Sequence, residues 1–127
     1  MITILVLLFV LASTVTLMAK MKNINTRKAY ELIEERDGDS DFVILDVRTP
    51  EEFAEGYVEN AVNIDFYEDV FPDELEGLDR DKTYLIYCRS GSRSGKTFKM
   101  MENLGFKDVY NMKGGIESWR ADYPLVR

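Results

Sequence analysis

The sequence predicts an α/β fold, in which a sheet of mainly parallel strands is covered by helices on both faces. Two observations predict it. Short apolar runs alternate with amphipathic stretches throughout the chain after Lys22. The run at residues 42–47 is apolar except for Asp46 near its end, as expected of a strand that is buried on both faces, and the run at residues 83–88 is rich in β-branched and aromatic residues. Because we find no repeat, low-complexity tract or linker after Lys22, we expect one domain over residues 21–127.

Each element is predicted by its own spacing of apolar residues. In chain order, the expected elements are a helix over 26–38, a strand over 42–47, a helix over 49–57, a strand over 61–64, a loop with a short helix over 66–82, a strand over 83–88, a helix over 92–106, a strand over 108–112 and a short helix that begins near 114 and ends before Pro124. The acidic stretch over 68–81 is expected to be a solvated face.

Capping residues mark where two of the helices begin. The helix over 26–38 is expected to start at an N-cap, Thr26. The next helix carries a stronger start signal. Thr49 is expected to cap it, Pro50 fits its first position, and Glu52 completes a capping box.

The first 19 residues carry no charged side chain. As a helix they would be about 28 Å long, close to the ~30 Å hydrocarbon core of a bilayer. A membrane anchor over residues 1–20, followed by basic residues, would tether the domain on the cytoplasmic side. A second alternative also stays open: the translation start is assigned too far upstream, because Met18 or Met21 could begin a compact cytoplasmic domain. A cleaved signal peptide, which implies export, ranks behind both: no basic residue precedes the apolar run, and Leu17 stands where a small residue is needed.

Composition argues against several classes of function. A net charge of −7 disfavours a nucleic-acid-binding surface. The chain has one cysteine, Cys88, and no histidine, so it has neither an internal disulfide nor the ligands of a zinc cluster. We therefore expect no metal and no cofactor.

Cys88 ends the strand over 83–88, and ligands of open α/β sheets bind at such strand ends. The small residues after it leave backbone N–H groups free to turn inward, and Gly91 permits a φ that other residues resist. This loop leads into a helix N-terminus and also carries Arg89, Arg93 and Lys96. We expect these charges and amides to lower the pKa of the thiol below its ordinary value of ~8.5 without a histidine base. An inert buried thiol would not explain the polar, cationic loop.

Three stretches resemble the single-domain type of the rhodanese (sulfurtransferase) superfamily. They are LIYCRSGSRS, ILDVRTPEEFAEGYVENAVNI and VYNMKGGIESWRADYPLV. The resemblance extends over roughly residues 23–127. It implies a three-layer α/β/α sandwich around a five-stranded, mainly parallel sheet.

The resemblance also implies that Cys88 takes sulfane sulfur from a small-molecule donor such as thiosulfate. Cys88 would hold it as a persulfide and pass it to a thiol or protein acceptor. The residues implied to bind the substrate are Arg89, Ser90, Gly91, Ser92 and Arg93. Their amides would surround the outer sulfur, and either arginine could bind the anionic oxygens of the donor. Asp46 and Arg48 of the signature motif are expected to be mainly structural. They would support the site through hydrogen bonds and an ion pair without contacting the substrate.

Two other functions stay open. One is a rhodanese-like module that binds a partner without catalysis, although inactive members of the family usually lack the cysteine. The other is oxyanion chemistry of the phosphatase or arsenate reductase type, whose loop is one residue longer; here four residues separate Cys88 from Arg93. Tyr57 stands where the family usually has histidine, and a substrate-facing role for it also stays open.

Overall fold

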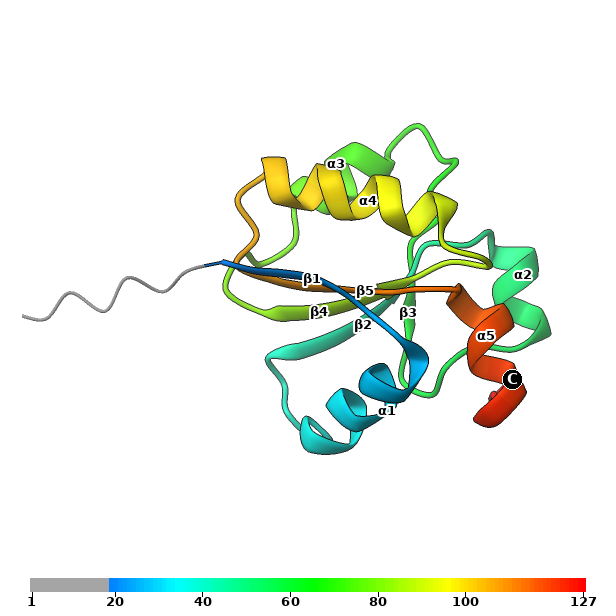
Figure 1. Ribbon diagram of the computed structural model, residues 1–127. Helices are drawn as coiled ribbons and strands as arrows, with labels where there is room; N and C mark the ends of the chain where they lie inside the picture. The colour runs from blue at the N-terminus through cyan, green and yellow to red at the C-terminus, as the bar shows by residue number, and fades with distance from the viewer. Residues whose placement is uncertain (1–18) are drawn as a thin grey trace, which may run out of the picture.

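The computed structural model describes residues 19–127, which form a five-stranded sheet with helices on both faces (Figure 1). The strands are β1 (Lys20–Ile24), β2 (Phe42–Asp46), β3 (Val62–Asn63), β4 (Thr83–Tyr87) and β5 (Asp108–Met112). The helices are α1 (Thr26–Glu35), α2 (Pro50–Glu55), α3 (Phe71–Glu76), α4 (Ser92–Asn103) and α5 (Gly115–Asp122).

The three alternatives for residues 1–20 concern residues that lie almost entirely outside the described part of the chain. Among the helices over residues 19–127, none has both the length and the apolar character that crossing a membrane requires.

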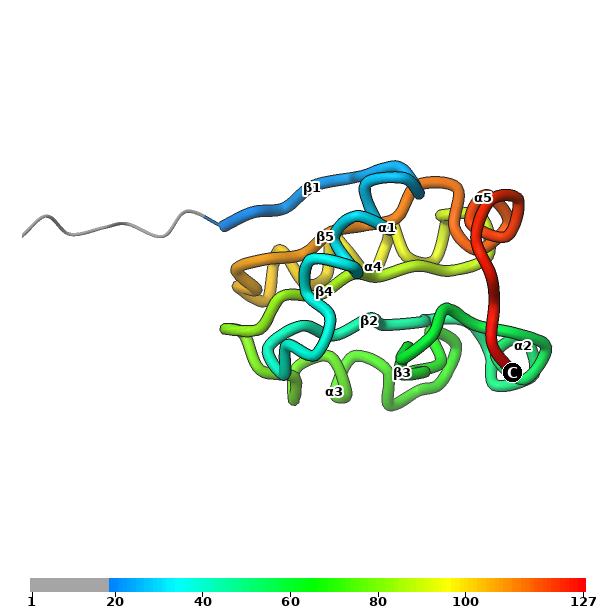
Figure 2. The backbone as a smooth tube through the Cα atoms, turned by 90° about the horizontal axis from the view of Figure 1, so that it is seen from below, coloured from blue at the N-terminus to red at the C-terminus, as the bar shows by residue number. Residues whose placement is uncertain are grey.

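The predicted three-layer α/β/α architecture is confirmed. The strand order is β1-β5-β4-β2-β3, and every neighbouring pair is parallel, as Figure 2 displays from β1 at the top to β3 near the bottom. Helices α3 and α4 cover one face and α1 and α5 the other, while α2 lies beyond one end of the sheet (Figure 1).

The burial of strand β4 explains why its sequence lacks exposed polar positions. Its side chains alternate between the two faces, and all five residues are buried. Tyr84 and Ile86 belong to the hydrophobic cluster under α3 and α4. Leu85 and Tyr87 belong to the cluster under α1 and α5. A central strand covered on both sides has no solvent-facing positions, so its sequence shows no polar alternation.

Of the two N-caps predicted from the sequence, one is confirmed and one is wrong. Thr49 caps α2 and forms the expected capping box with Glu52. The prediction of Thr26 as the N-cap of α1 is wrong: Asn25 is the N-cap, and its side chain accepts a hydrogen bond from the amide of Lys28. Asparagine and threonine both suit this position, so local sequence does not choose between neighbours.

Strand β1 was not predicted from its residues. Its sequence, KMKNI, is mostly exposed, with only Ile24 buried. It is the edge strand beside β5, and its residues form a parallel ladder with that strand. Edge strands carry charged side chains and lack a full apolar pattern, so periodicity does not reveal them.

The connections that leave the parallel neighbours β2 and β4 lead to opposite sides of the sheet. From β2 the chain proceeds to β3 on one side, and from β4 it proceeds to β5 on the other. Such an arrangement leaves a crevice beyond the carboxyl ends of the two strands. Asp46 ends β2 and Cys88 directly follows β4, so the fold brings both residues to the same edge of the sheet.

Candidate active site

Cys88 lies at the base of a turn that wraps around its sulfur. Its side chain belongs to the hydrophobic cluster under α3 and α4, and only 1% of the residue is exposed. The turn ends at Gly91, the N-cap of α4, which adopts a φ of 117° that favours glycine. The amide of Gly91 donates a hydrogen bond to Sγ at 3.1 Å. The sulfur is therefore shielded from bulk water but faces the backbone donors of the turn.

The surroundings of Cys88 favour the thiolate. Burial alone would raise the pKa of the thiol. The Ser94 hydroxyl and the amides of Ser94, Gly91 and Ser90 surround the sulfur with donors, which outweigh burial and lower the pKa of the thiol from its ordinary value. The N-terminus of α4, a twelve-residue helix, also points its unpaired amides at the loop. The loop thus supplies hydrogen-bond donors that stabilise the negative charge of a thiolate, which is the nucleophilic form of cysteine.

Both arginines of the loop are bound to glutamates. Arg89 is largely exposed, and its Nε donates to the carboxylate of Glu117 at 2.9 Å. Arg93 is mostly buried and donates from both terminal nitrogens to Glu52, at 2.6 and 3.0 Å. We expected either arginine to bind the oxygens of the donor. Each would have to do so while its guanidinium is already paired with a glutamate.

The N-terminus of α5 holds the other side of the loop. The amide of Ile116 donates to the carbonyl of Cys88 at 2.9 Å, and the amide of Glu117 donates to that of Arg89 at 3.1 Å. Gly115 makes this close approach possible. A Cβ at that position would lie 2.5 Å from both carbonyl oxygens, which is too close for any side chain. With these carbonyls held outward, the amides of the turn are left to face the sulfur.

Comparison with known proteins agrees with this geometry. Residues 27–122 match the rhodanese-like domain family. The chain belongs to that family. Among curated relatives, YtwF of Bacillus subtilis, whose name describes a sulfurtransferase, is 39% identical over 103 residues, 81% of this chain and 94% of that protein. The thiosulfate sulfurtransferase GlpE of Coxiella burnetii is 33% identical over 103 residues, which cover 81% and 91% of the two chains.

Solved structures of rhodanese-like proteins share the fold. A rhodanese-related protein from Thermoplasma volcanium superposes with a TM-score of 0.70 at 32% identity, covering 83% of this chain and 97% of that one. A rhodanese-like domain protein from Staphylococcus aureus has a TM-score of 0.67 at 37% identity, covering 84% and 97%. The resemblance read from the three motifs is therefore confirmed at the level of the family.

In this rhodanese-like domain, Asp46 and Arg48 form a buried ion pair beneath α2. Two nitrogens of the Arg48 guanidinium donate to the Asp46 carboxylate, at 2.7 to 3.0 Å, and Asp46 is fully buried. Arg48 also donates to the carbonyl of Gly56 at 2.7 Å, which ties the end of α2 to β2. Neither residue has a hydrogen bond to the sulfur of Cys88, which fits an ordering role.

Tyr57, which replaces the usual histidine of the rhodanese family, packs within the protein. Its ring stacks on Phe53 with centroids 4.0 Å apart. Its backbone exchanges hydrogen bonds of 2.9 Å with Val126 near the C-terminus. These contacts give Tyr57 a place in the wall next to α2; a role toward substrate stays a prediction.

Sequence reasoning missed two residues of the candidate site. Ser94 is fully buried and helps to lower the pKa of Cys88, although it is the last residue of the CRSGSRS motif. Its place, six residues after the cysteine on the first turn of α4, was the available signal. Glu52 was read only as a capping residue. No local signal indicates its pairing with Arg93, because 41 positions separate the two.

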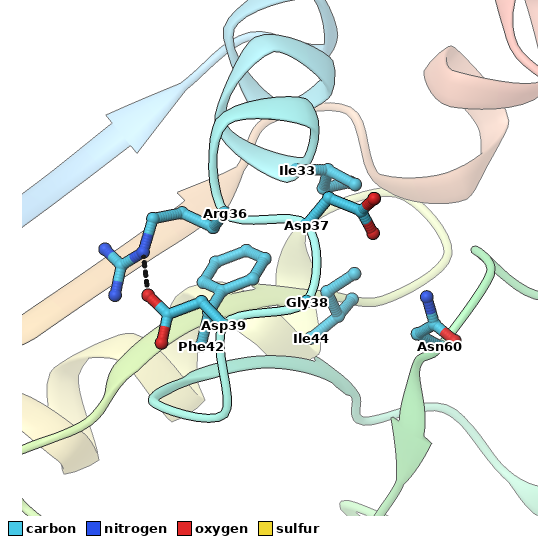
Figure 3. A pocket seen from close by; sticks show the side chains of 8 residues that line it. All are labelled: Ile33, Arg36, Asp37, Gly38, Asp39, Phe42, Ile44 and Asn60. Carbon is cyan, nitrogen blue, oxygen red and sulfur yellow. Dashed lines mark hydrogen bonds and ion pairs between the residues drawn. The ribbon is translucent and has the colours of Figure 1, made fainter.

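A separate hollow of about 300 Å³ lies at the opposite end of the sheet (Figure 3). Phe42, which lines it, starts β2, and β2 runs parallel to the strand that ends at Cys88. Arg36 in its wall pairs with Asp39 at 2.6 Å, as the dashed line marks. Since the only thiol lies at the other end and this guanidinium is paired, we do not assign the sulfur site here.

Proposed function

We propose that this chain is a sulfurtransferase that carries sulfane sulfur on Cys88. The donor is a small molecule such as thiosulfate, and the acceptor is a thiol or a protein. Membership of the rhodanese-like family supports the reaction class. Two of its relatives carry sulfurtransferase names, one of them a thiosulfate sulfurtransferase. The observation that carries the proposal is a loop whose amides and Ser94 hydroxyl lower the pKa of the only thiol.

The first step loads the enzyme. The Cys88 thiolate attacks the outer sulfur of thiosulfate, the S–S bond of the donor breaks, and sulfite leaves with the bonding electron pair. A cysteine persulfide anion remains. Its outer sulfur stands about 2.0 Å beyond Sγ, the length of an S–S bond. Because the amide of Gly91 already lies 3.1 Å from Sγ, we expect the charge of the outer sulfur to be shared among the donors of this turn.

The second step unloads the enzyme. A thiolate of the acceptor attacks the outer sulfur, the persulfide bond breaks, and Cys88 leaves as the thiolate with which the cycle began. Both attacking groups are anions, so neither step needs a proton from the protein. This accounts for a site without histidine: the protein supplies charge stabilisation where many cysteine enzymes supply a base.

The test is the mass of the intact protein after incubation with thiosulfate. We expect the wild-type chain to gain the mass of one sulfur atom, mapped to Cys88 and removed by cyanide. Cys88→Ser should gain none. An unmodified wild-type protein would sink the proposal. Faster turnover of an aryl phosphate than of thiosulfate would favour oxyanion chemistry instead, and partner capture that survives Cys88→Ser without any adduct would favour a binding module.

A further inference from the structure

Arg93 is enclosed by groups from two other parts of the chain. Its guanidinium forms a two-pronged ion pair with Glu52 of α2, and only 13% of the Arg93 side chain is exposed. The ring of Tyr67, in the loop between β3 and α3, lies 5.4 Å from the guanidinium carbon. Tyr67 itself is 66% exposed. Arg93 is therefore held between a carboxylate and an exposed aromatic ring at the rim of the Cys88 site, near enough for its charge to interact with that of Cys88.

Glu52 is fixed in this place by the start of its own helix. Its carboxylate accepts hydrogen bonds from the amide and hydroxyl of Thr49, while its amide donates to the same hydroxyl. The pair with Arg93 is the main reason that the pKa of Glu52 falls to about 2. Glu52 is consequently ionised at every pH at which the protein would work, and its position is set by the fold.

A carboxylate and a sulfur oxyanion compete for the same N–H donors of an arginine guanidinium. Each offers two oxygens to the parallel N–H bonds of the guanidinium. Glu52 already takes both terminal nitrogens of Arg93. An anionic donor that approaches Cys88 must either displace this carboxylate or use the remaining N–H groups of Arg93 beside a negative charge.

We propose that Glu52 is a specificity-determining residue that weakens the binding of oxyanion donors to the Cys88 loop. The inference deepens the proposed function and rests on it for the identity of the donor. It predicts that thiosulfate, a dianion whose leaving sulfite carries three oxygens, is disfavoured relative to an alkyl persulfide, whose leaving thiolate carries none. The amides of the loop remain available to both kinds of donor, so the preference is set by the ion pair at the rim.

The test of binding uses sulfate, which resembles the oxyanion end of thiosulfate and cannot transfer sulfur. The full-length ¹⁵N-labelled chain is titrated with sulfate while NMR follows the Gly91 amide and the Arg93 Nε–H. In Glu52→Gln we expect the midpoint to fall about fivefold, the value of a partly exposed ion pair of about 1 kcal/mol. Glutamine also completes a capping box, so the start of α2 should survive the change.

The matched control is Glu51→Gln, which removes the same charge from the same helical turn. Glu51 has no ion pair in the described part of the chain. Its variant should leave the sulfate midpoint within about twofold of wild type, because exposed charges near a site are screened. An unchanged midpoint in Glu52→Gln, or an equal fall in Glu51→Gln, would overturn the proposal.

A kinetic measurement connects binding to the reaction. In Glu52→Gln we expect the KM for thiosulfate to fall by a similar factor, while the KM for cysteamine persulfide stays the same. An equal change for both donors would contradict a role in donor choice. A protein that transfers sulfur from neither donor would sink the proposed function, whereas the sulfate titration judges the role of Glu52 on its own.

Discussion

At the scale of single residues, the charge of one sulfur depends on neighbours that carry no charge. The causes that lower the pKa of Cys88 are a hydroxyl and three amides. The two loop arginines are neutralised by Glu52 and Glu117. The thiolate is thus stabilised mainly by oriented dipoles, which are fixed before any substrate arrives.

Ser94→Ala tests this account of the thiol. Loss of the hydroxyl hydrogen bond should raise the pKa of Cys88, so less thiolate is present at neutral pH. The measurement is the rate of alkylation by iodoacetamide as a function of pH. In wild type we expect the midpoint to lie below that of a free cysteine, and in Ser94→Ala at a higher pH than in wild type. Ser40→Ala, at an exposed turn far from the loop, should leave the profile unchanged.

The ionisation of Cys88 and Glu52 also makes the free energy of unfolding depend on pH. The pKa of Cys88 is lower in the folded chain, so its ionisation stabilises the fold fully above the unfolded value. That contribution is lost as the pH falls through the folded pKa. The ion pair of Glu52 follows the same sign in an acidic window: its contribution is present above pH 4.5 and disappears as the pH falls towards about 2.

At the scale of elements, the site is a junction of three segments. The loop after β4 supplies the sulfur and its donors, the N-terminus of α5 holds the loop carbonyls, and α2 supplies the partner of Arg93. The contact between α5 and the loop leaves room only for the hydrogen of Gly115.

Gly115→Ala should therefore disturb the site as well as the fold. Alanine at a φ of 58° costs about 1–2 kcal/mol, and its Cβ would press on the carbonyls of Cys88 and Arg89. We expect slower persulfide formation and a lower free energy of unfolding in urea.

Gly105→Ala is the matched control for this substitution. Gly105 also has a positive φ, 83°, but a Cβ there meets nothing within 4 Å. It should cost about 1 kcal/mol of strain without changing the rate at Cys88. Equal rates in the two variants would show that α5 does not shape the loop.

At the scale of the whole molecule, the sheet separates two hydrophobic clusters, and a buried ion pair lies at the end of one central strand. Asp46 has no exposed surface, and three of its hydrogen bonds come from the side chain of Arg48. Such a pair adds little compared with apolar residues, but breaking it leaves a buried charge without a partner.

Arg48→Ala should lower the free energy of unfolding by about 3–5 kcal/mol, because it strands the Asp46 carboxylate. The measurement is urea unfolding. Arg27→Ala, which removes the exposed pair with Glu31 on α1, should cost at most about 0.5 kcal/mol. Similar losses in the two variants would mean that the buried pair is solvated or compensated elsewhere.

Much of this protein follows from the sequence, since it depends on contacts between near neighbours. Strands β2, β3, β4 and β5, the capping box of α2 and the unusual φ of Gly91 were all predictable. So was the position of Cys88 where a strand meets a helix. Apolar periodicity, capping and backbone conformation are set within a few residues, and the motif around the cysteine lies within one short loop.

Other features depend on which distant segments meet. Residues 20–24 form strand β1 because they pair with the edge of β5. Their own mostly polar sequence does not predict a strand. Glu52 reads as a cap, and only the packing of α2 beside α4 makes it the partner of Arg93. The strand order, the grip of α5 on the loop and the pairing of both arginines were likewise decided by the tertiary structure. Their physical reason is shared: each is a contact between residues far apart in the chain, and local patterns carry no information about distant partners.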